Sequence, residues 1–227
     1  MIILTGSTGG IGSEVLRELS LIDNVFAIYN TTKPNNENLK LNNVEFYKLD
    51  VTSEQEIFKF IKLNKNRFKN LTLINLAGIS SDGLLINFNQ DDWEKVFKIN
   101  ITSNFLLSKY LIPFMIKDKW GRIIHFSSIA SGQGVGAYSS SKEAINGLSK
   151  SISKEYGRFN ITSNVLKLGA FDAGMLNKLS TKEKKSFTDA IPNKTLGSAD
   201  NIVNAIIFII KSNFLNGSSI TIDGGAT

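Results

Sequence analysis

The sequence predicts one α/β domain over residues 1–227, in which a mainly parallel seven-stranded sheet is covered by helices on both faces. Short β-rich runs alternate with helix-length amphipathic stretches along the chain, and a glycine-rich segment directly follows the first run. A length of 227 residues suits one domain of this kind. Strands that alternate with helices form right-handed βαβ units, which build a parallel sheet between two helix layers. We therefore expect a three-layer α/β/α sandwich.

The predicted strands are short aliphatic and β-branched runs at residues 2–4, 25–29, 44–49, 71–76, 122–126, 161–166 and 219–222. The predicted helices are amphipathic stretches at residues 11–19, 53–63, 91–99, 102–117, 138–156 and 201–210. Ser53 and Glu56 have the spacing of a capping box, which marks the start of the second helix. Residues 33–40 are predicted as a loop or frayed helix, and residues 170–192 as a polar, irregular lid.

The composition excludes several kinds of chemistry. The chain has no cysteine, which excludes disulfides, thiolate catalysis and cysteine-ligated zinc. A single histidine, His125, makes a His-based triad or a histidine-rich metal site implausible, so we expect no metal. The lysines behind the net charge of +6 are scattered, and no arginine-rich patch with interleaved aromatics predicts nucleic-acid binding.

Neither a signal peptide nor a membrane span is expected. The N-terminal residues MIILTG show no basic region, no long apolar stretch and no cleavage site. The longest aliphatic run, residues 205–210, is far shorter than the ~18 residues that a span needs. We therefore expect a cytoplasmic protein.

A glycine-rich turn between the first strand and the first helix predicts a dinucleotide site. The expected contacts are Gly6, Ser7, Thr8, Gly10, Ile11 and Gly12. A helix N-terminus with free N–H groups stabilises pyrophosphate charge, provided that the backbone can approach closely. Gly6 would permit the turn, Gly10 the approach, and Gly12 close packing of helix on strand. The alternative is an ordinary strand-to-helix turn, but the position at the start of a βαβ series favours a Rossmann-type site.

Tyr138 and Lys142 predict acid–base chemistry. Residues four apart share one face of a helix, and a nearby cation favours the phenolate and lowers a tyrosine pKa. Ser128 ends the fifth strand, at the edge where open α/β sheets bind ligands, and alternation places His125 on the other face of that strand as a structural residue. Ser127 and Ser131 remain alternatives to Ser128, and an ordinary exposed Tyr/Lys pair is the alternative for the helix.

Together these motifs resemble the short-chain dehydrogenase/reductase family along nearly the whole chain. The family's cofactor turn falls on residues 5–12, and its late Asp-Gly-Gly on residues 223–225. Its other motif positions fall on Asp50 beside Val51 in the adenine pocket, on Asn75, Ala77 and Gly78, on Asn100, and on Ser128, Tyr138 and Lys142. Plainer alternatives are a turn residue for Asp50, a sheet-edge cap for Asn75 and a helix-interior polar residue for Asn100.

The resemblance implies a mechanism. Tyr138 would protonate the carbonyl oxygen as hydride arrives, Ser128 would hydrogen-bond the same oxygen, and Asn100 would position a proton-relay water. Lys142 would lower the tyrosine pKa and bind the nicotinamide ribose, and Gly169 would lie at the cofactor. The general pattern is similar to that of 3-oxoacyl-acyl-carrier-protein reductases, which implies reduction of a ketone. Alternatives are a member of the family that acts on a sugar or other small alcohol, and a non-catalytic dinucleotide sensor.

Asn30 and Lys33 indicate NADP rather than NAD. An acid after the second strand would accept ribose hydroxyls and repel a 2′-phosphate, and here the stretch carries no acid and one lysine. Three departures from the family stand out: a shorter connection between Ser128 and Tyr138, Leu168 in place of a proline, and Ala173 in place of a threonine at the cofactor amide.

Two surface interactions are also expected. The helix at residues 102–117 carries apolar side chains around more of its surface than packing on one sheet face requires. Together with the helix at 138–156 it predicts a homo-oligomer, either a tetramer or a dimer. Lys119 and Arg158 are candidates for a positive surface that would meet an acidic carrier protein, although both could simply be solvated charges.

Overall fold

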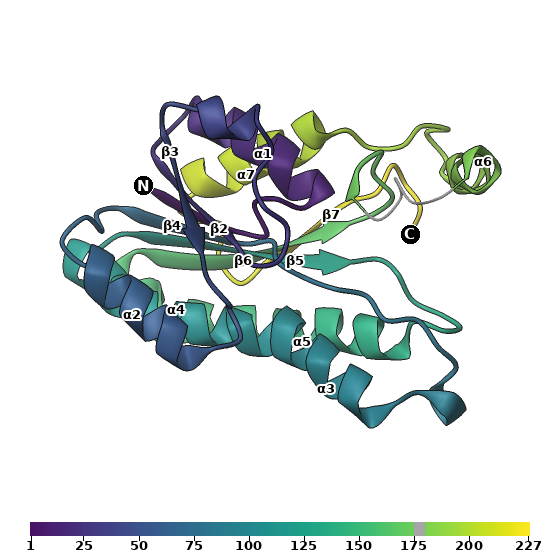
Figure 1. Ribbon diagram of the computed structural model, residues 1–227, viewed down its shortest axis with the longest axis horizontal. Helices are drawn as coiled ribbons and strands as arrows, with labels where there is room; N and C mark the ends of the chain where they lie inside the picture. The colour runs from purple at the N-terminus through teal and green to yellow at the C-terminus, as the bar shows by residue number, and fades with distance from the viewer. Residues whose placement is uncertain (175–179) are drawn as a thin grey trace.

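The computed structural model describes residues 1–174 and 180–227, and its strands form one parallel sheet in the order β3-β2-β1-β4-β5-β6-β7 (Figure 1). The strands are β1 (Ile2–Thr5), β2 (Val25–Tyr29), β3 (Val44–Lys48), β4 (Leu71–Asn75), β5 (Gly121–Ser128), β6 (Ile161–Leu168) and β7 (Ser219–Ile222). The seven predicted strands are confirmed, and β5 and β6 each extend two residues further at their C-terminal ends.

Helices cover both faces of the sheet, as predicted. They are α1 (Gly10–Ser20), α2 (Glu54–Asn64), α3 (Gln90–Phe97), α4 (Ser103–Asp118), α5 (Gly136–Tyr156), α6 (Thr181–Ala190) and α7 (Ala199–Lys211). Short turns are η1 (Asn38–Lys40), η2 (Leu85–Asn87), η3 (Lys98–Thr102) and η4 (Gly157–Phe159). Figure 1 shows α1 and α7 on one face of the sheet and α2, α4 and α5 on the other.

The core consists of two apolar layers, one on each face of the sheet. Ile3 of β1 packs in one buried cluster with side chains of α2 and α4, whereas Ile2 and Leu4 pack in the other with side chains of α1 and α7. Successive residues of a strand face opposite sides, so a strand covered on both faces must be apolar throughout. The rigid sheet that results holds the C-terminal ends of β1, β4, β5 and β6 at one edge.

The capping box predicted for α2 forms only in part. The Ser53 hydroxyl accepts from the Glu56 backbone N–H, which confirms Ser53 as the N-cap. The Glu56 carboxylate instead accepts from the backbone N–H of Asp50, 2.9 Å away. The acid therefore ties the helix start to the turn that follows β3.

The predicted break between two helices near residue 100 is absent. The π-helical turn η3 joins α3 to α4 without interruption. A π-helical turn shifts the hydrogen-bond register by one residue, and such turns are frequent at functional sites. It turns Asn100 into the interior of the protein.

The predicted lid at residues 170–192 contains a helix that the sequence interpretation missed. This helix, α6, begins at a complete capping box between Ser180 and Glu183. The sequence carried this signal, Ser-x-x-Glu, but the polar composition masked it. Residues 175–179 of the predicted lid lie outside the described residues.

Among the residues that the structure describes, no helix combines the length and the apolar composition needed to cross a bilayer.

Candidate active site

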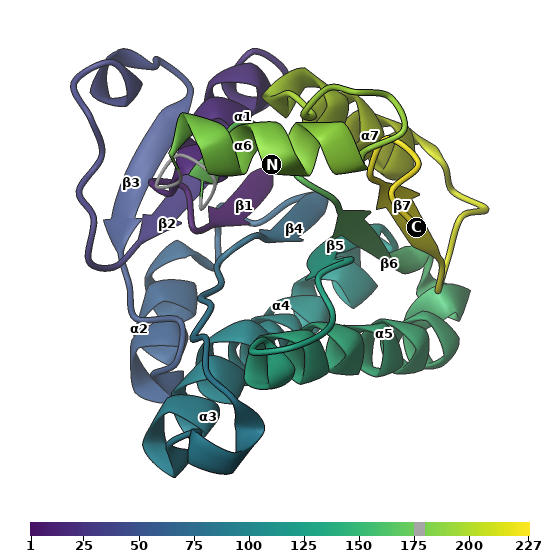
Figure 2. The ribbon, with the colours of Figure 1, turned by 90° about the vertical axis from the view of Figure 1, so that its right-hand side faces the viewer.

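The predicted site residues gather at the C-terminal edge of the sheet, which Figure 2 shows nearly end-on. The turn between β1 and α1 lies there, with Gly6 at a φ of +68°, in the left-handed region that favours glycine. Gly6 also passes so close to the segment after β4 that an added Cβ would lie 2.9 Å from the Cα of Ala77. The Ala77 N–H in turn donates to the Thr5 hydroxyl across 3.1 Å.

Gly10 and Gly12 of the turn each permit a close backbone contact. A Cβ on Gly12 would lie 2.0 Å from the carbonyl oxygen of Gly6, so this glycine serves the turn itself rather than the packing of helix on strand. A Cβ on Gly10 would lie 2.4 Å from the backbone nitrogen of Gly174. The start of the lid therefore packs directly on the glycine-rich turn.

Ser7, Thr8 and Ile11 differ in their environments. Ser7 is fully buried, and its hydroxyl donates to the Ile28 carbonyl oxygen across 3.0 Å, which joins the turn to β2. Thr8 and Ile11 are half-buried, and Ile11 lies under Gly174. Ser7 thus supports the turn through its side chain.

The residues predicted for the adenosine end lie after β2 and β3. Asn30 and Lys33 are both exposed where β2 ends. The Asp50 carboxylate accepts from the backbone N–H and the hydroxyl of Thr52, at 2.8 and 2.7 Å. Its side chain therefore stabilises the turn after β3, which is the alternative role given for Asp50 above. Val51 is buried in the core.

Asn75 and His125 form part of a buried polar cluster beneath α4. The Asn75 amide nitrogen lies 3.2 Å from His125 Nδ1, and the Asn104 side-chain oxygen lies 2.8 Å from the same nitrogen. Burial, with the nearby charge of Lys142, lowers the pKa of His125 to about 3. The imidazole is therefore neutral and fully enclosed, as expected of a structural residue, and Asn75 is an interior residue rather than a sheet-edge cap.

Asn100 ties three segments together. Its side-chain oxygen accepts from the Ile79 N–H at 2.8 Å, and its amide donates to the Ile79 carbonyl oxygen and to the Ser141 hydroxyl, both at 2.9 Å. Gly78 leaves room for this arrangement, because an added Cβ there would lie 3.3 Å from Asn100 Oδ1 and 3.1 Å from Lys142 Nζ.

Ser128 is the serine that lies at Tyr138. The Ser128 hydroxyl acts on the Tyr138 phenol and lowers its pKa in part, whereas the Ser127 hydroxyl points to α5 and donates to the Lys142 carbonyl oxygen across 2.9 Å. Ser131 is exposed in the connecting loop. The shorter loop between β5 and α5 closes with Gly132 and Gly134 at φ values of +118° and +84°.

Lys142 is buried, and its ammonium donates to the Phe126 carbonyl oxygen across 2.9 Å. Burial disfavours the charged form and lowers the pKa of Lys142 to about 8. The Lys142 nitrogen lies 5.7 Å from the centre of the Tyr138 ring.

The expectation that Lys142 lowers the Tyr138 pKa is not met. Burial raises the pKa of Tyr138, the hydrogen bond from Ser128 partly offsets that rise, and the Asp82 charge adds to it. The lysine is directed at the Phe126 carbonyl rather than at the phenol oxygen. Tyr138 therefore keeps its proton at neutral pH.

Two further predicted positions lie where β6 ends. Gly169 packs against the backbone of Asp223, since an added Cβ would lie 2.6 Å from the Asp223 Cα. Ala173 is buried and immediately precedes Gly174, which contacts the glycine-rich turn. Position 173 thus lies beside the predicted cofactor turn.

The sequence interpretation missed Ser141 and Gly174. Ser141 is fully buried, donates to the Tyr138 carbonyl oxygen across 2.7 Å, and accepts from Asn100. Its partner Asn100 lies 41 residues away in the sequence, so no local pattern points to this contact. Gly174 likewise contacts Gly10 of the glycine-rich turn, which is far away in the sequence.

The fold and the glycine-rich turn define the doubly wound α/β class of dinucleotide-binding proteins. A family model described as short chain dehydrogenase matches residues 1–184. A 3-oxoacyl-[acyl-carrier-protein] reductase FabG of Buchnera aphidicola subsp. Baizongia pistaciae is 35% identical, over 98% of this chain and 95% of that protein. The FabG protein of B. aphidicola subsp. Schizaphis graminum is 33% identical with the same coverage.

A solved structure described as ElxO with NADP bound superimposes with a TM-score of 0.89 at 29% identity. The superposition covers 99% of this chain and 97% of the ElxO chain. The chain therefore belongs to the short-chain dehydrogenase/reductase family, whose members are oxidoreductases.

Proposed function

We propose that the protein reduces the ketone of a 3-oxoacyl thioester to an alcohol, with NADPH as the hydride donor. The observation that carries this proposal is the grouping of Tyr138, Ser128 and Lys142 where β5 ends and α5 begins, near the glycine-rich turn. The names of the FabG relatives support the substrate class, and the NADP in the ElxO structure supports the cofactor.

The residues at the turn suit a dinucleotide. The N-cap of α1 is Gly9, without a side-chain hydrogen bond, and the first turn of α1 carries no acid. The N–H groups and the positive end of the helix dipole therefore face an anion without competition. Gly6, Gly10 and Gly12 keep side chains out of the turn, with Thr8 and Ile11 at its flanks.

Tyr138 is the proton donor in this proposal. Its raised pKa means that the phenol carries its proton at neutral pH, so the proton is present on Tyr138 when reduction begins. Ser128 hydrogen-bonds the same substrate oxygen, so two donors stabilise the negative charge that develops there. A bound nicotinamide supplies the hydride.

Lys142 and Asn100 act around this pair. The Lys142 ammonium, anchored on the Phe126 carbonyl, holds the nicotinamide ribose, and its charge stabilises developing negative charge nearby. Asn100 positions the proton-relay water and braces α5 through Ser141.

NADPH is proposed over NADH because Asn30 and Lys33 follow β2 and neither is an acid. The rest of the proposed cofactor-binding set mostly shapes the edge of the sheet; it consists of Asp50, Val51, Asn75, Ala77, Gly78 and Gly169.

We further propose a single domain over residues 1–227, a cytoplasmic location and a homo-oligomer built through α4 and α5. Phe105 supports the oligomer, because it is 47% exposed on α4.

The test is an NADPH-oxidation assay with acetoacetyl thioesters, simple ketones, quinones and keto sugars as parallel substrates. The proposal expects turnover on acetoacetyl thioesters to exceed turnover on the other carbonyls by at least about 10-fold in kcat/KM. Preferred reduction of a keto sugar would contradict the substrate class while leaving the carbonyl chemistry in place.

Light scattering across micromolar concentrations tests the proposed homo-oligomer, and the mass of a monomer at every concentration would refute it.

A further inference from the structure

Residues 79–83, in the segment between β4 and α3, border the proposed active site and are tied to it at both ends. At one end, the Ile79 N–H and carbonyl oxygen hydrogen-bond the Asn100 side chain at 2.8 and 2.9 Å. At the other end, the Gly83 N–H donates to the Gly134 carbonyl oxygen across 2.8 Å. Figure 1 shows this segment running beside the loop that joins β5 to α5. The residues between the two ties are therefore held next to the start of α5.

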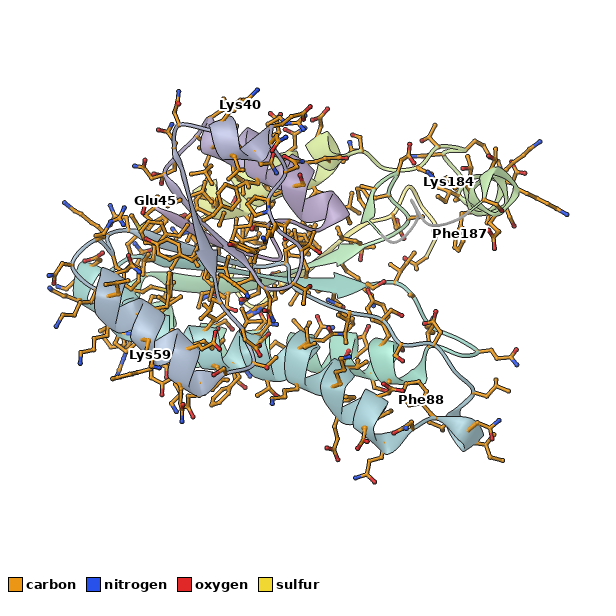
Figure 3. The ribbon with its side chains drawn as sticks, viewed as in Figure 1. Lys40, Glu45, Lys59, Phe88, Lys184 and Phe187 are labelled. Atoms are coloured by element: carbon orange, nitrogen blue, oxygen red, sulfur yellow. The ribbon has the colours of Figure 1, made fainter. Side chains whose placement is uncertain are left out.

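Further contacts fix the same segment from both sides. An added Cβ on Gly136 would lie 3.9 Å from Leu85 Cδ1, so Leu85 reaches the first residue of α5. Gly83 packs on Phe88, which Figure 3 labels beside α3, because an added Cβ would lie 3.1 Å from the Phe88 ring. Tyr138 follows Gly136 by two residues, in the first turn of α5. The segment therefore passes beside the turn of helix that carries the proposed acid.

Asp82 brings a negative charge to this place. Its carboxylate accepts from the Ser80 hydroxyl across 2.7 Å, which holds the side chain within the segment, and Asp82 is exposed. Burial is the main cause of the raised pKa of Tyr138, and the Asp82 charge adds to it, so the carboxylate lies close enough to act on the phenol through space. The proposed proton transfer from Tyr138 gives this charge no role.

A fixed negative charge beside the reacting carbonyl distinguishes substrates by their own charge. Like charges repel over the few ångströms that separate groups in a site, and water and salt weaken this repulsion without removing it. In a free 3-oxo acid, one methylene group separates the ketone from a carboxylate, whereas a thioester is neutral at that position. Lys142 supplies an opposing charge, but it is buried with its ammonium on the Phe126 carbonyl oxygen. Asp82, in contrast, is exposed to an entering substrate.

We propose that Asp82 is a specificity residue that repels substrates with an anionic group next to the ketone. The site then accepts the neutral thioester of a 3-oxo acid and discriminates against the free acid. The ties at Ile79 and Gly83 matter for this role, because a carboxylate on an untethered loop would turn away into water. The inference rests on the proposed reduction of 3-oxoacyl thioesters, and it adds the charge that the substrate must have beside its ketone.

The test compares acetoacetyl-N-acetylcysteamine, which is neutral, with acetoacetate, which carries the same ketone beside a carboxylate. The measured quantity is kcat/KM for acetoacetate divided by kcat/KM for the thioester, with NADPH as the donor. This ratio should be below one in the parent and should rise about fivefold in Asp82→Asn, because asparagine keeps an acceptor for the Ser80 hydroxyl but loses the charge. Added salt should raise the ratio in the parent and change it less in Asp82→Asn.

Two variants are the matched controls. Asp91→Asn removes the same charge from an exposed side chain at the start of α3, and Ser80→Ala removes the hydrogen bond but keeps the Asp82 charge. Both should keep the ratio within about twofold of the parent value.

Three outcomes would overturn the role of Asp82: an unchanged ratio in Asp82→Asn, an equal rise in Asp91→Asn, or a parent that reduces acetoacetate as well as the thioester. Each of these leaves the proposed reduction of thioesters in place. A parent that reduces neither substrate would instead refute the proposed function, and the specificity role with it.

Discussion

The Asn100 amide donates to the Ser141 hydroxyl across 2.9 Å, which links the π-helical turn η3 to the helix that carries Tyr138 and Lys142. Ser141 passes the contact on by donating to the Tyr138 carbonyl oxygen. Both side chains are fully buried. The position of the proposed acid therefore depends on a hydroxyl that touches no reacting atom.

Replacing Ser141 with alanine tests this link. The change leaves the Asn100 amide one partner short, which should cost about 1–2 kcal/mol and lower Tm by roughly 2–8 °C. We expect kcat to fall several-fold while the Kd of NADPH hardly changes. Ser140→Ala, at an exposed position on the same helix, is the control. Parent-like Tm and kcat in Ser141→Ala would show that the link carries no weight.

His125 should remain neutral across the whole physiological range. Burial and the Lys142 charge lower its pKa from 6.5 to about 3. Between these two pH values the imidazole is protonated in the unfolded chain and neutral in the folded chain. Stability should therefore fall as the pH drops from 6.5 towards about 3, by up to ~1.4 kcal/mol per pH unit from this group.

NMR can follow this residue without assignment, because it is the only histidine in the chain. Its ring resonances should not titrate between about pH 8 and pH 5 in the folded protein, and should titrate normally in urea. A folded-state midpoint near the ordinary value would mean that the imidazole is open to solvent.

Lys33 should contribute to the preference for NADPH. Lys33→Ala removes one exposed cation, which at about 1 kcal/mol raises the Kd of NADPH ~5-fold and leaves the Kd of NADH unchanged. Lys40→Ala, an exposed lysine of η1, serves as the control and should change neither value. Equal affinities for the two cofactors in the parent, unaffected by Lys33→Ala, would refute the assignment.

Ala173→Thr should tighten NADPH binding. Ala173 adjoins Gly174, which packs on the glycine-rich turn, and a hydroxyl there could hydrogen-bond the nicotinamide carboxamide. One such bond is worth about 0.5–1.5 kcal/mol, or roughly 2- to 12-fold in affinity. We expect a lower Kd with a similar kcat, measured by cofactor fluorescence and steady-state assay. An unchanged Kd would place this position away from the nicotinamide.

Local patterns were sufficient for most of the fold. β2 and β7 match their predicted bounds, because each is a short apolar run between polar turns and needs no distant partner to be recognised. The α6 helix was missed even though Ser180 and Glu183 spell its capping box, since its composition lacks the apolar periodicity on which the prediction relied.

The sequence was sufficient to identify the candidate site residues, but not the contacts that these residues make. Spacing identified Tyr138 and Lys142, yet the direction of the Tyr138 pKa shift depends on how deeply the fold buries the phenol. The contact of Gly10 with Gly174 joins segments far apart in the chain, so only the assembled structure reveals it. Burial and long-range contact are properties of tertiary packing, which periodicity does not encode.

The most direct test of the whole account is turnover in a Tyr138→Phe variant, measured beside the Kd of NADPH. The phenol acts on the substrate oxygen, so its loss should lower kcat by about 100-fold or more and leave the Kd within about twofold. Tyr156→Phe, at the other end of α5, should retain parent activity. Near-parent turnover in Tyr138→Phe, on a substrate that the parent reduces, would contradict the assignment of Tyr138 as the acid.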